Sequence, residues 1–216
     1  MPVLRIPEEI EELRSSFRQF IDREVRPVEE ANRQELQETG TFAAVDEERD
    51  RLRRRSADLG FWAVHMPEEV GGAGLSYLGQ VLLFEEAGGS GLIMAQNESV
   101  LPVVSGPSPI YLDCTDEQRD RYLKPLITGE AKTCFALTEP EAGSDATRIK
   151  TRADKADGGW VLNGRKHFIT GGAEADFALV FGVTDPEKRA HGGITAFLVD
   201  RGTPGFSVTR IQHTMS

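Results

Sequence analysis

The chain has 216 residues, of which 39% are hydrophobic, and a formal net charge of −10. This composition is typical of a soluble globular protein with one large domain or two small ones. The acidic balance argues against nucleic acid as the main partner, because the phosphate backbone demands a basic protein surface.

Helical periodicity dominates the first half of the sequence. Over residues 6–25 apolar side chains recur at steps of three and four, which places them on one helix face, and Pro27 is expected to end or kink this helix. A charged helix is expected over 46–59, closed by Gly60. Its basic run at 51–55 follows four acidic residues, so we interpret it as an ion-paired, solvated helix face.

Two hydroxyl residues mark further helix starts. Ser76 ends the glycine-rich bend MPEEVGGAGLS and is placed to cap a helix that follows it. Thr115 precedes a charged first turn that contains Gln118, which is the pattern of a capping box. A further helix of small residues is expected to start near Leu92, so the sequence up to about residue 130 predicts an α-helical domain.

After residue 130 the hydrophobic period changes to two, which is typical of strands. Turns are expected at Asp157-Gly158-Gly159 and at Asn163-Gly164. The expected strands are TCFALTE, three strands within 149–170, FALVFGVT, ITAFLVD and PGFSVTRI. The predicted fold class is therefore α+β: an N-terminal all-α helical domain (1–130) precedes an antiparallel β-barrel-like domain (131–216). We expect the second domain to be incomplete, because its last strand stops at the chain end.

The cysteines and histidines predict neither disulfides nor a metal site. Cys114 and Cys134 are too few for a disulfide framework and too far apart for paired ligands, and no His-x-x-x-His pair occurs. The start of the chain is too short and too charged for a signal peptide, and no long apolar run follows. We therefore expect a cytoplasmic protein without a membrane span.

The segment CFALTEPEAGSDATR at 134–148 carries the most informative polar residues. It lacks the Gly-x-Ser-x-Gly frame of a nucleophile elbow, and the chain contains neither a Gly-x-Gly-x-x-Gly nor a phosphate-binding Gly-x-x-x-x-Gly-Lys motif. A nucleotide cofactor would therefore bind outside the Rossmann scheme.

Together with three other motifs, this segment resembles the acyl-CoA dehydrogenase family. TEPEAGSDAT is followed by VLNGRKHFITGG, as in that family, while MPEEVGGAGLS and DEQRDRYLKPLITGE resemble its helical domain and the approach to its β domain. The resemblance runs from about residue 7 to the end of the chain, with the motifs in the family's order.

The resemblance implies FAD as cofactor and an acyl-CoA thioester as substrate. An isoalloxazine ring needs hydrogen-bond donors at its edge and a flat group against one face. The hydroxyls of Thr138 and Thr170 and strand-end amides could supply the donors, and Phe168 the flat face, where many relatives carry tryptophan. By resemblance, the cofactor-binding residues are Phe135, Ala136, Leu137, Thr138, Gly143, Ser144, Phe168, Ile169 and Thr170.

Two further roles follow from the same resemblance. Ser144 would also touch the pantetheine or phosphate arm of the acyl-CoA, and Glu139 is expected to be structural rather than a catalytic acid. Taken singly, these residues have simpler explanations: a threonine at a strand end satisfies the backbone, Ser144 and Asp145 form a turn, and Phe168 belongs to the core. Only their combination at this spacing favours the flavin site.

The family oxidises an acyl-CoA between its α and β carbons, with hydride transfer to flavin N5, and passes electrons to an electron-transfer flavoprotein or a similar acceptor. Its glutamate base lies in a further helical domain, so no catalytic residue is assigned here, and the 216 residues alone are expected to be inactive or to need a partner. The full-length protein is expected to be a homo-oligomer. Two alternatives stay open: a non-catalytic flavin- or acyl-CoA-binding fragment, and a relative of flavin monooxygenases or nitroalkane oxidases.

Overall fold

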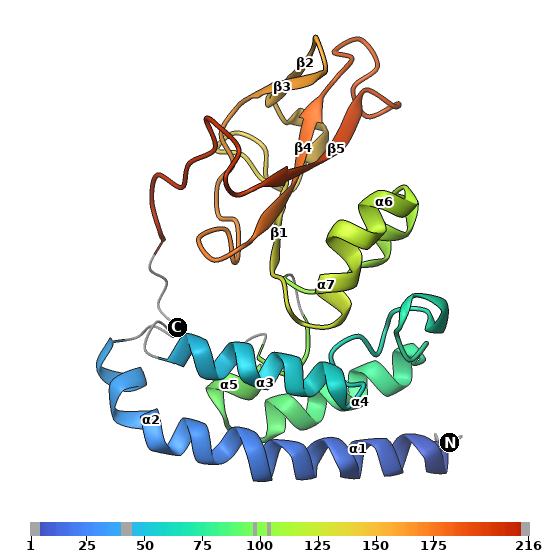
Figure 1. Cartoon of the computed structure of the whole chain (residues 1–216), viewed down its shortest axis with the longest axis vertical. Coiled ribbons are helices and arrows are strands. Elements are labelled where there is room, and N and C mark those ends of the chain that lie inside the picture. The colour runs from blue at the N-terminus through green and yellow to red at the C-terminus, as the bar shows by residue number, and fades with distance from the viewer. Residues whose placement is uncertain (1–4, 40–44, 97–98, 103–104, 213–216) are drawn as a thin grey trace. The chain divides into compact units, whose positions relative to one another are not determined.

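The computed structural model describes residues 5–39, 45–96, 99–102 and 105–212. These residues form two compact units that divide between Ala131 and Lys132. The first unit is helical and the second contains a sheet, so the α+β fold class expected from the sequence is confirmed (Figure 1). Among the described helices, none is long and apolar enough to span a bilayer.

In the helical unit, α1 leads into α2, α3 follows along the chain, and α4 packs against α1. Figure 1 shows α4 running beside α1, and the two helices are in contact. The described helices are α1 (Glu8–Phe20), α2 (Arg26–Thr39), α3 (Asp46–Asp58), α4 (Tyr77–Gly89), α5 (Ile93–Gln96), α6 (Asp116–Gln118) and α7 (Lys124–Ile127).

The core of this unit contains the apolar face predicted for the first helix. Phe17, Phe20 and Phe61 form an aromatic cluster, with the rings of Phe17 and Phe61 4.9 Å apart and edge to face. The edge-to-face pair of Phe17 and Phe61 suits the ring quadrupoles, while Phe20 and Phe61 are stacked at 5.9 Å. Ile10, Phe17, Phe20, Ile21 and Val25 are all buried, as the three-and-four spacing predicts.

Pro27 does not end the helix, so one of the two outcomes that the sequence predicts there, an end or a kink, is wrong. The chain passes from α1 through a π-helical turn, Ile21–Val25, directly into α2. The wider turn lets the amide of Arg26 bond to the carbonyl of Ile21, immediately before the proline that lacks an N–H. Pro125 in α7 follows the same kind of turn, Arg119–Leu123, so both prolines are accommodated within a helix in the same way.

The helix caps follow the sequence patterns. The Ser76 hydroxyl accepts a hydrogen bond from the amide of Gly79, 3.3 Å away, at the start of α4. Thr115 and Gln118 form the expected capping box at α6. Gly60 follows α3 with φ +81°, a conformation that glycine adopts at little cost.

The charged run of α3 is ion-paired, as expected. Arg51 contacts Glu48 at 2.8 Å and Arg55 contacts Glu24 at 3.1 Å. Arg53 departs from the expectation of a solvated face, because it is buried and donates to the carbonyl of Gly129. Arg53 therefore links α3 to the chain at Gly129 and does not face water.

The second unit contains a five-stranded mixed sheet with β4 at its centre. The antiparallel strand β5 lies along one edge of β4, from Phe177 opposite Asp200 to Val183 opposite Ile194. The other edge is shared by β1 and, at one position, by β2. The strands are β1 (Thr133–Ala136), β2 (Arg152–Ala156), β3 (Gly159–Asn163), β4 (Phe177–Val183) and β5 (Ile194–Asp200).

The expectation of an antiparallel domain holds for β2–β3 and β4–β5 but is wrong for β1–β4 and for the single bridge of β2 with β4, which are parallel. A parallel pair needs a long crossover, and here residues 137–176 provide it, with the β2–β3 hairpin inside it. β4 is buried along most of its length, as its continuous apolar sequence suits.

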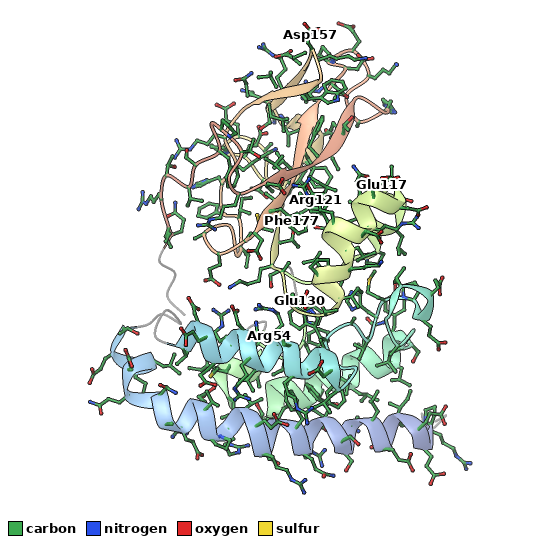
Figure 2. The ribbon with its side chains drawn as sticks, in the orientation of Figure 1. Arg54, Glu117, Arg121, Glu130, Asp157 and Phe177 are labelled. Atoms are coloured by element: carbon green, nitrogen blue, oxygen red, sulfur yellow. The ribbon has the colours of Figure 1, made fainter. Side chains whose placement is uncertain are left out.

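Two predicted strands are not formed in the described part of the second unit. Residues 165–170 and 204–211 have no strand partner, although both alternate apolar and polar side chains. Residues 165–170 are held instead by one backbone hydrogen bond, from His167 to Thr138, and by hydrogen bonds of the Lys166 side chain to residues 137–139. The predicted hairpin turn at 157–159 is confirmed, with Asp157 at its tip (Figure 2) and Gly158 at φ +82°.

Candidate functional site

The predicted site begins where β1 ends. The chain leaves the sheet after Ala136, and residues 137–139 run beside residues 166–167. The amide of His167 donates to the carbonyl of Thr138 at 2.9 Å, and Nζ of Lys166 donates to the carbonyl of Leu137 at 3.0 Å. Two segments of the motif that are nearly thirty residues apart are thus held together.

Glu139 is the hub of this arrangement. Its buried carboxylate accepts hydrogen bonds from the amide of Lys150 (2.6 Å), from the amide and hydroxyl of Thr151 (2.9 and 2.5 Å) and from Nζ of Lys166 (2.8 Å). Burial by itself would raise the pKa of Glu139, but these hydrogen bonds outweigh it and lower the pKa to about 2. The group stays ionised and its acceptor capacity is used, which suits a structural carboxylate rather than a catalytic acid.

The lysine of this ion pair is itself mostly buried, with 12% of its side chain exposed. Burial lowers the pKa of Lys166, while the hydrogen bond to Glu139 opposes that shift. The pair therefore depends on both partners, since either charge alone would remain in a poorly solvated place.

Gly164 is required by close packing rather than by a turn. A Cβ atom at this position would collide with the side chain and Cα of Thr151, the residue that donates twice to Glu139. The sequence indicated a turn at Asn163-Gly164, but here β3 ends and the chain passes tightly over Thr151. The glycine lets the segment of Lys166 approach Glu139.

Phe168 presents its ring to the surface. Its side chain is 67% exposed, and its backbone has φ +55°, which is uncommon for a bulky residue. Ile169 turns the other way and packs against the sheet core near Cys134 and Ala178. Ile169 therefore anchors the segment to the sheet core, while Phe168 exposes its ring.

The Gly143–Ser144 corner lies beyond a tight turn closed by reciprocal backbone bonds between Glu139 and Ala142, 3.0 and 3.1 Å long. Both corner residues are exposed. Asp145 caps the next turn, since its carboxylate accepts from the amide and the hydroxyl of Thr147. The Asp145 side chain is therefore a turn former, whereas the Ser144 hydroxyl has no hydrogen bond to the described residues.

Not every predicted residue presents its side chain to the same place. Phe135 is 39% exposed with its ring 4.8 Å from that of Phe181, while Ala136 is buried in the sheet core. Leu137 packs on the cluster around Ile149. Ala136 can therefore serve a ligand only through its backbone, Leu137 is partly buried, and Phe135 lies next to another aromatic ring.

The open hydrogen-bonding groups fit the edge of a flavin. Within the described chain, the hydroxyls of Thr138 and Thr170 and the amides of Thr138 and residues 168–170 donate no hydrogen bond. The bond between His167 and Thr138 holds the two segments that carry these donors together, and the exposed ring of Phe168 belongs to one of them. A planar heterocycle with acceptors along one edge needs such a combination.

Sequence reasoning missed the residues that hold this site together. The sequence pattern predicts strands or turns at Lys166, His167, Thr151 and Gly164 and assigns these residues no role in the site. One signal was available: a lysine within an apolar strand-like run (HFIT follows it) needs a carboxylate partner if it is buried. The partner, Glu139, is 27 positions away, which no local pattern specifies.

The helical unit has a surface depression of about 460 Å³, at which Figure 2 labels Arg54 and Glu130. Its lining contains none of the predicted site residues, and consists of Arg51, Arg54, Arg55, Asp58, Thr128 and Glu130. Among the described residues, no three His, Cys, Asp or Glu side chains gather as metal ligands.

Comparison with known protein families identifies both halves of the chain. Residues 7–130 match the family model of the acyl-CoA dehydrogenase N-terminal domain. Residues 134–216 match that of the acyl-CoA dehydrogenase middle domain.

Individual relatives agree with these matches. A 3-(aryl)acrylate reductase of Clostridium sporogenes is 36% identical over 212 residues, covering 96% of this chain and 52% of that protein. Subunit CarC of the caffeyl-CoA reductase-Etf complex of Acetobacterium woodii is 37% identical over 182 residues, covering 84% of this chain and 46% of that protein. The chain thus spans about half the length of the curated relatives it matches.

A solved structure agrees as well. The crystal structure of a glutaryl-CoA dehydrogenase from Mycobacterium smegmatis in complex with FADH2 matches with a TM-score of 0.76 and 31% identity. The match covers 98% of this chain and 50% of that chain.

Proposed function

The chain belongs to the acyl-CoA dehydrogenase family, and from this premise we propose that it forms the flavin- and thioester-binding half of an FAD-dependent acyl-CoA dehydrogenase. The observation that carries the proposal is the hydrogen-bonded junction of residues 137–139 with 166–167, next to open donors and the exposed ring of Phe168. The proposed domains are the helical domain, 1–130, and the central β domain, 131–216.

We assign the cofactor-binding roles residue by residue. The hydroxyls of Thr138 and Thr170 and the amides of 168–170 would donate to the edge of the isoalloxazine, and Phe168 would lie against its face. Phe135, Ala136, Leu137, Gly143 and Ile169 would line the site through backbone atoms or apolar packing. When bound, FAD supplies the acceptor for the hydride that leaves the β-carbon of the acyl chain.

Ser144 is assigned to the substrate as well as to the cofactor site. Its exposed hydroxyl, free of bonds to the described residues, would donate to the pantetheine or phosphate arm of the acyl-CoA. Glu139 holds the corner that carries Ser144 through its bonds to Thr151 and Lys166. No glutamate of the chain is assigned as the base that removes the α-proton, so full turnover is proposed only for the whole protein.

The same half-reaction runs in either direction, and the names of two relatives are those of reductases of acrylate-type compounds. We therefore propose the acyl-CoA/enoyl-CoA pair as the substrate class, without a fixed direction. An electron-transfer flavoprotein is the proposed electron partner, supported by the Etf complex that one relative's name describes. We also propose that the full-length protein is a homo-oligomer and that it is located in the cytoplasm.

The test is a spectral titration of the FAD-loaded chain with acyl-CoA thioesters. We expect butyryl-CoA or cinnamoyl-CoA to perturb the visible flavin band, and Ser144→Ala to weaken this response several-fold, as for the loss of one hydrogen bond of about 1 kcal/mol. Ser207→Ala, which changes an exposed serine outside the site, is the matched control.

Other outcomes select the alternatives. A response to nitroethane but to no acyl-CoA would favour a nitroalkane oxidase-like relative. Binding of acyl-CoA without any binding of FAD would favour the non-catalytic fragment. Rapid acyl-CoA-dependent dye reduction by this chain alone would contradict the assignment of no base.

A further inference from the structure

Phe168 has a backbone conformation that its own side chain disfavours. It and Arg189 are the non-glycine residues of the described chain with positive φ, at 55° and 43°. A bulky residue rarely adopts this region, and such a conformation persists only where the surrounding structure imposes it. The cause must lie in the contacts of residues 167–169.

The conformation brings two neighbouring rings onto the same side of the chain. In an extended segment, consecutive side chains point to opposite faces. Here the ring centroids of His167 and Phe168 are 3.8 Å apart with an interplanar angle of 26°, so the rings are stacked. The imidazole therefore covers part of one face of the Phe168 ring.

His167 is fixed from two directions. Its amide donates to the carbonyl of Thr138 at 2.9 Å, and its ring nitrogen Nε2 lies 3.4 Å from Nε2 of Gln212. The residue is only partly exposed, whereas Phe168 is 67% exposed. The stack thus has an anchored inner ring and an outer ring open to a ligand.

We propose that His167 is a positioning residue that holds the ring of Phe168 in the orientation in which it receives the flavin. This inference rests on the proposed function, because it concerns the residue that would face the isoalloxazine. The flavin would then add a third layer to a stack whose first two layers are already ordered. An exposed phenylalanine without this backing would lose rotamer freedom on binding, and that loss would weaken affinity.

The experiment measures FAD affinity of the purified chain by quenching of flavin fluorescence. Stacked aromatic pairs contribute enough that we expect His167→Ala to weaken FAD binding on the order of tenfold and to reduce the quenching of bound flavin. His167→Phe keeps an aromatic ring in the inner layer and should retain both affinity and quenching. His167→Leu fills the space without a ring and should behave as His167→Ala does, which covers the case that the alanine variant does not fold.

The outcomes separate this inference from the proposed function. Wild-type affinity in a folded His167→Ala or His167→Leu variant would overturn the role of His167 and leave the flavin site standing. A loss as large in His167→Phe as in His167→Leu would also overturn it, because the ring would then be irrelevant. Absence of FAD binding by the wild-type chain would overturn both.

Discussion

At the scale of single residues, the buried carboxylate of Glu139 holds several segments of the second unit together. Glu139 is ionised in the folded state because hydrogen bonds lower its pKa from 4.5 to about 2 against the effect of burial. A folded pKa below the unfolded value stabilises the protein above the unfolded pKa, and this contribution is lost as pH falls toward the folded pKa. The shift corresponds to about 3 kcal/mol at neutral pH.

We therefore expect Glu139→Gln to lower the free energy of unfolding by about 3 kcal/mol near neutral pH, because Lys166 would keep a mostly buried charge without its partner. Urea denaturation followed by circular dichroism measures this. Between about pH 5 and pH 2 the wild-type protein should lose this stabilisation, while the variant should lose less. Glu141→Gln, an exposed neighbour paired with Lys150, should leave the free energy of unfolding unchanged. A variant as stable as the wild type would contradict the hub role.

Gly164 offers a second test at the residue scale. Gly164→Ala would push a methyl group into Thr151 and so disturb both bonds from Thr151 to Glu139. We expect a loss of about 1–3 kcal/mol in the free energy of unfolding, measured by urea denaturation. Gly159→Ala is the matched control, because a Cβ there meets nothing within 4 Å. Equal stability of the two variants would mean that the segment can move away from Thr151.

Sequence reasoning identified Thr138, Ser144 and Phe168 as candidates because their motif is local in the chain. It did not identify the residues that place them, since Lys166 meets Glu139 from 27 positions away and Gly164 meets Thr151 through packing alone. The left-handed backbone of Phe168 had no sequence signal, because phenylalanine rarely adopts it.

At the scale of elements, the carboxylate of Glu86 makes the shortest ion pairs between α1 and α4. Glu86 accepts from both Arg18 (2.7 and 2.8 Å) and Arg14 (2.7 Å), and the hydrogen bond from Arg18 is the main reason that the pKa of Glu86 is lowered. The side chain of Glu86 is only 11% exposed, so solvent screens its ion pairs less than those of a surface residue.

We expect Glu86→Gln to lower the free energy of unfolding of the helical unit by about 1–2 kcal/mol. The chain has two tryptophans, so in a Trp160→Phe background the fluorescence of the buried Trp62 reports on this unit. Glu85→Gln is the control, because Glu85 is 66% exposed and 3.7 Å from Arg14. An equal effect of both changes would show that only overall charge matters.

Element starts were predictable where side chains cap the backbone, as Ser76 and Thr115 do. The continuation of a helix through a proline was not predictable, because a proline predicts a helix end unless the preceding turn widens. The π-helical turns before Pro27 and Pro125 provide that widening, and no residue pattern within these turns predicts it.

At the scale of the whole molecule, the α+β class followed from the change of hydrophobic period, but the sheet topology did not. Thr133 pairs with Phe177 in the parallel register, and the pattern of either strand alone is equally compatible with an antiparallel neighbour. For the same reason, residues 204–211 were expected to form a strand although the described chain gives them no partner.

The central claim is that residues 135–138 and 168–170 bind FAD, and a titration of FAD with the chain tests it most directly. We expect saturable quenching of flavin fluorescence, weakened by more than about tenfold in Phe168→Ala and several-fold in Thr138→Val. Trp160→Ala, which removes another exposed aromatic side chain of the same unit, should bind FAD as the wild type does. The account would be contradicted if the wild-type chain left flavin fluorescence unchanged, or if Phe168→Ala bound FAD as tightly as Trp160→Ala.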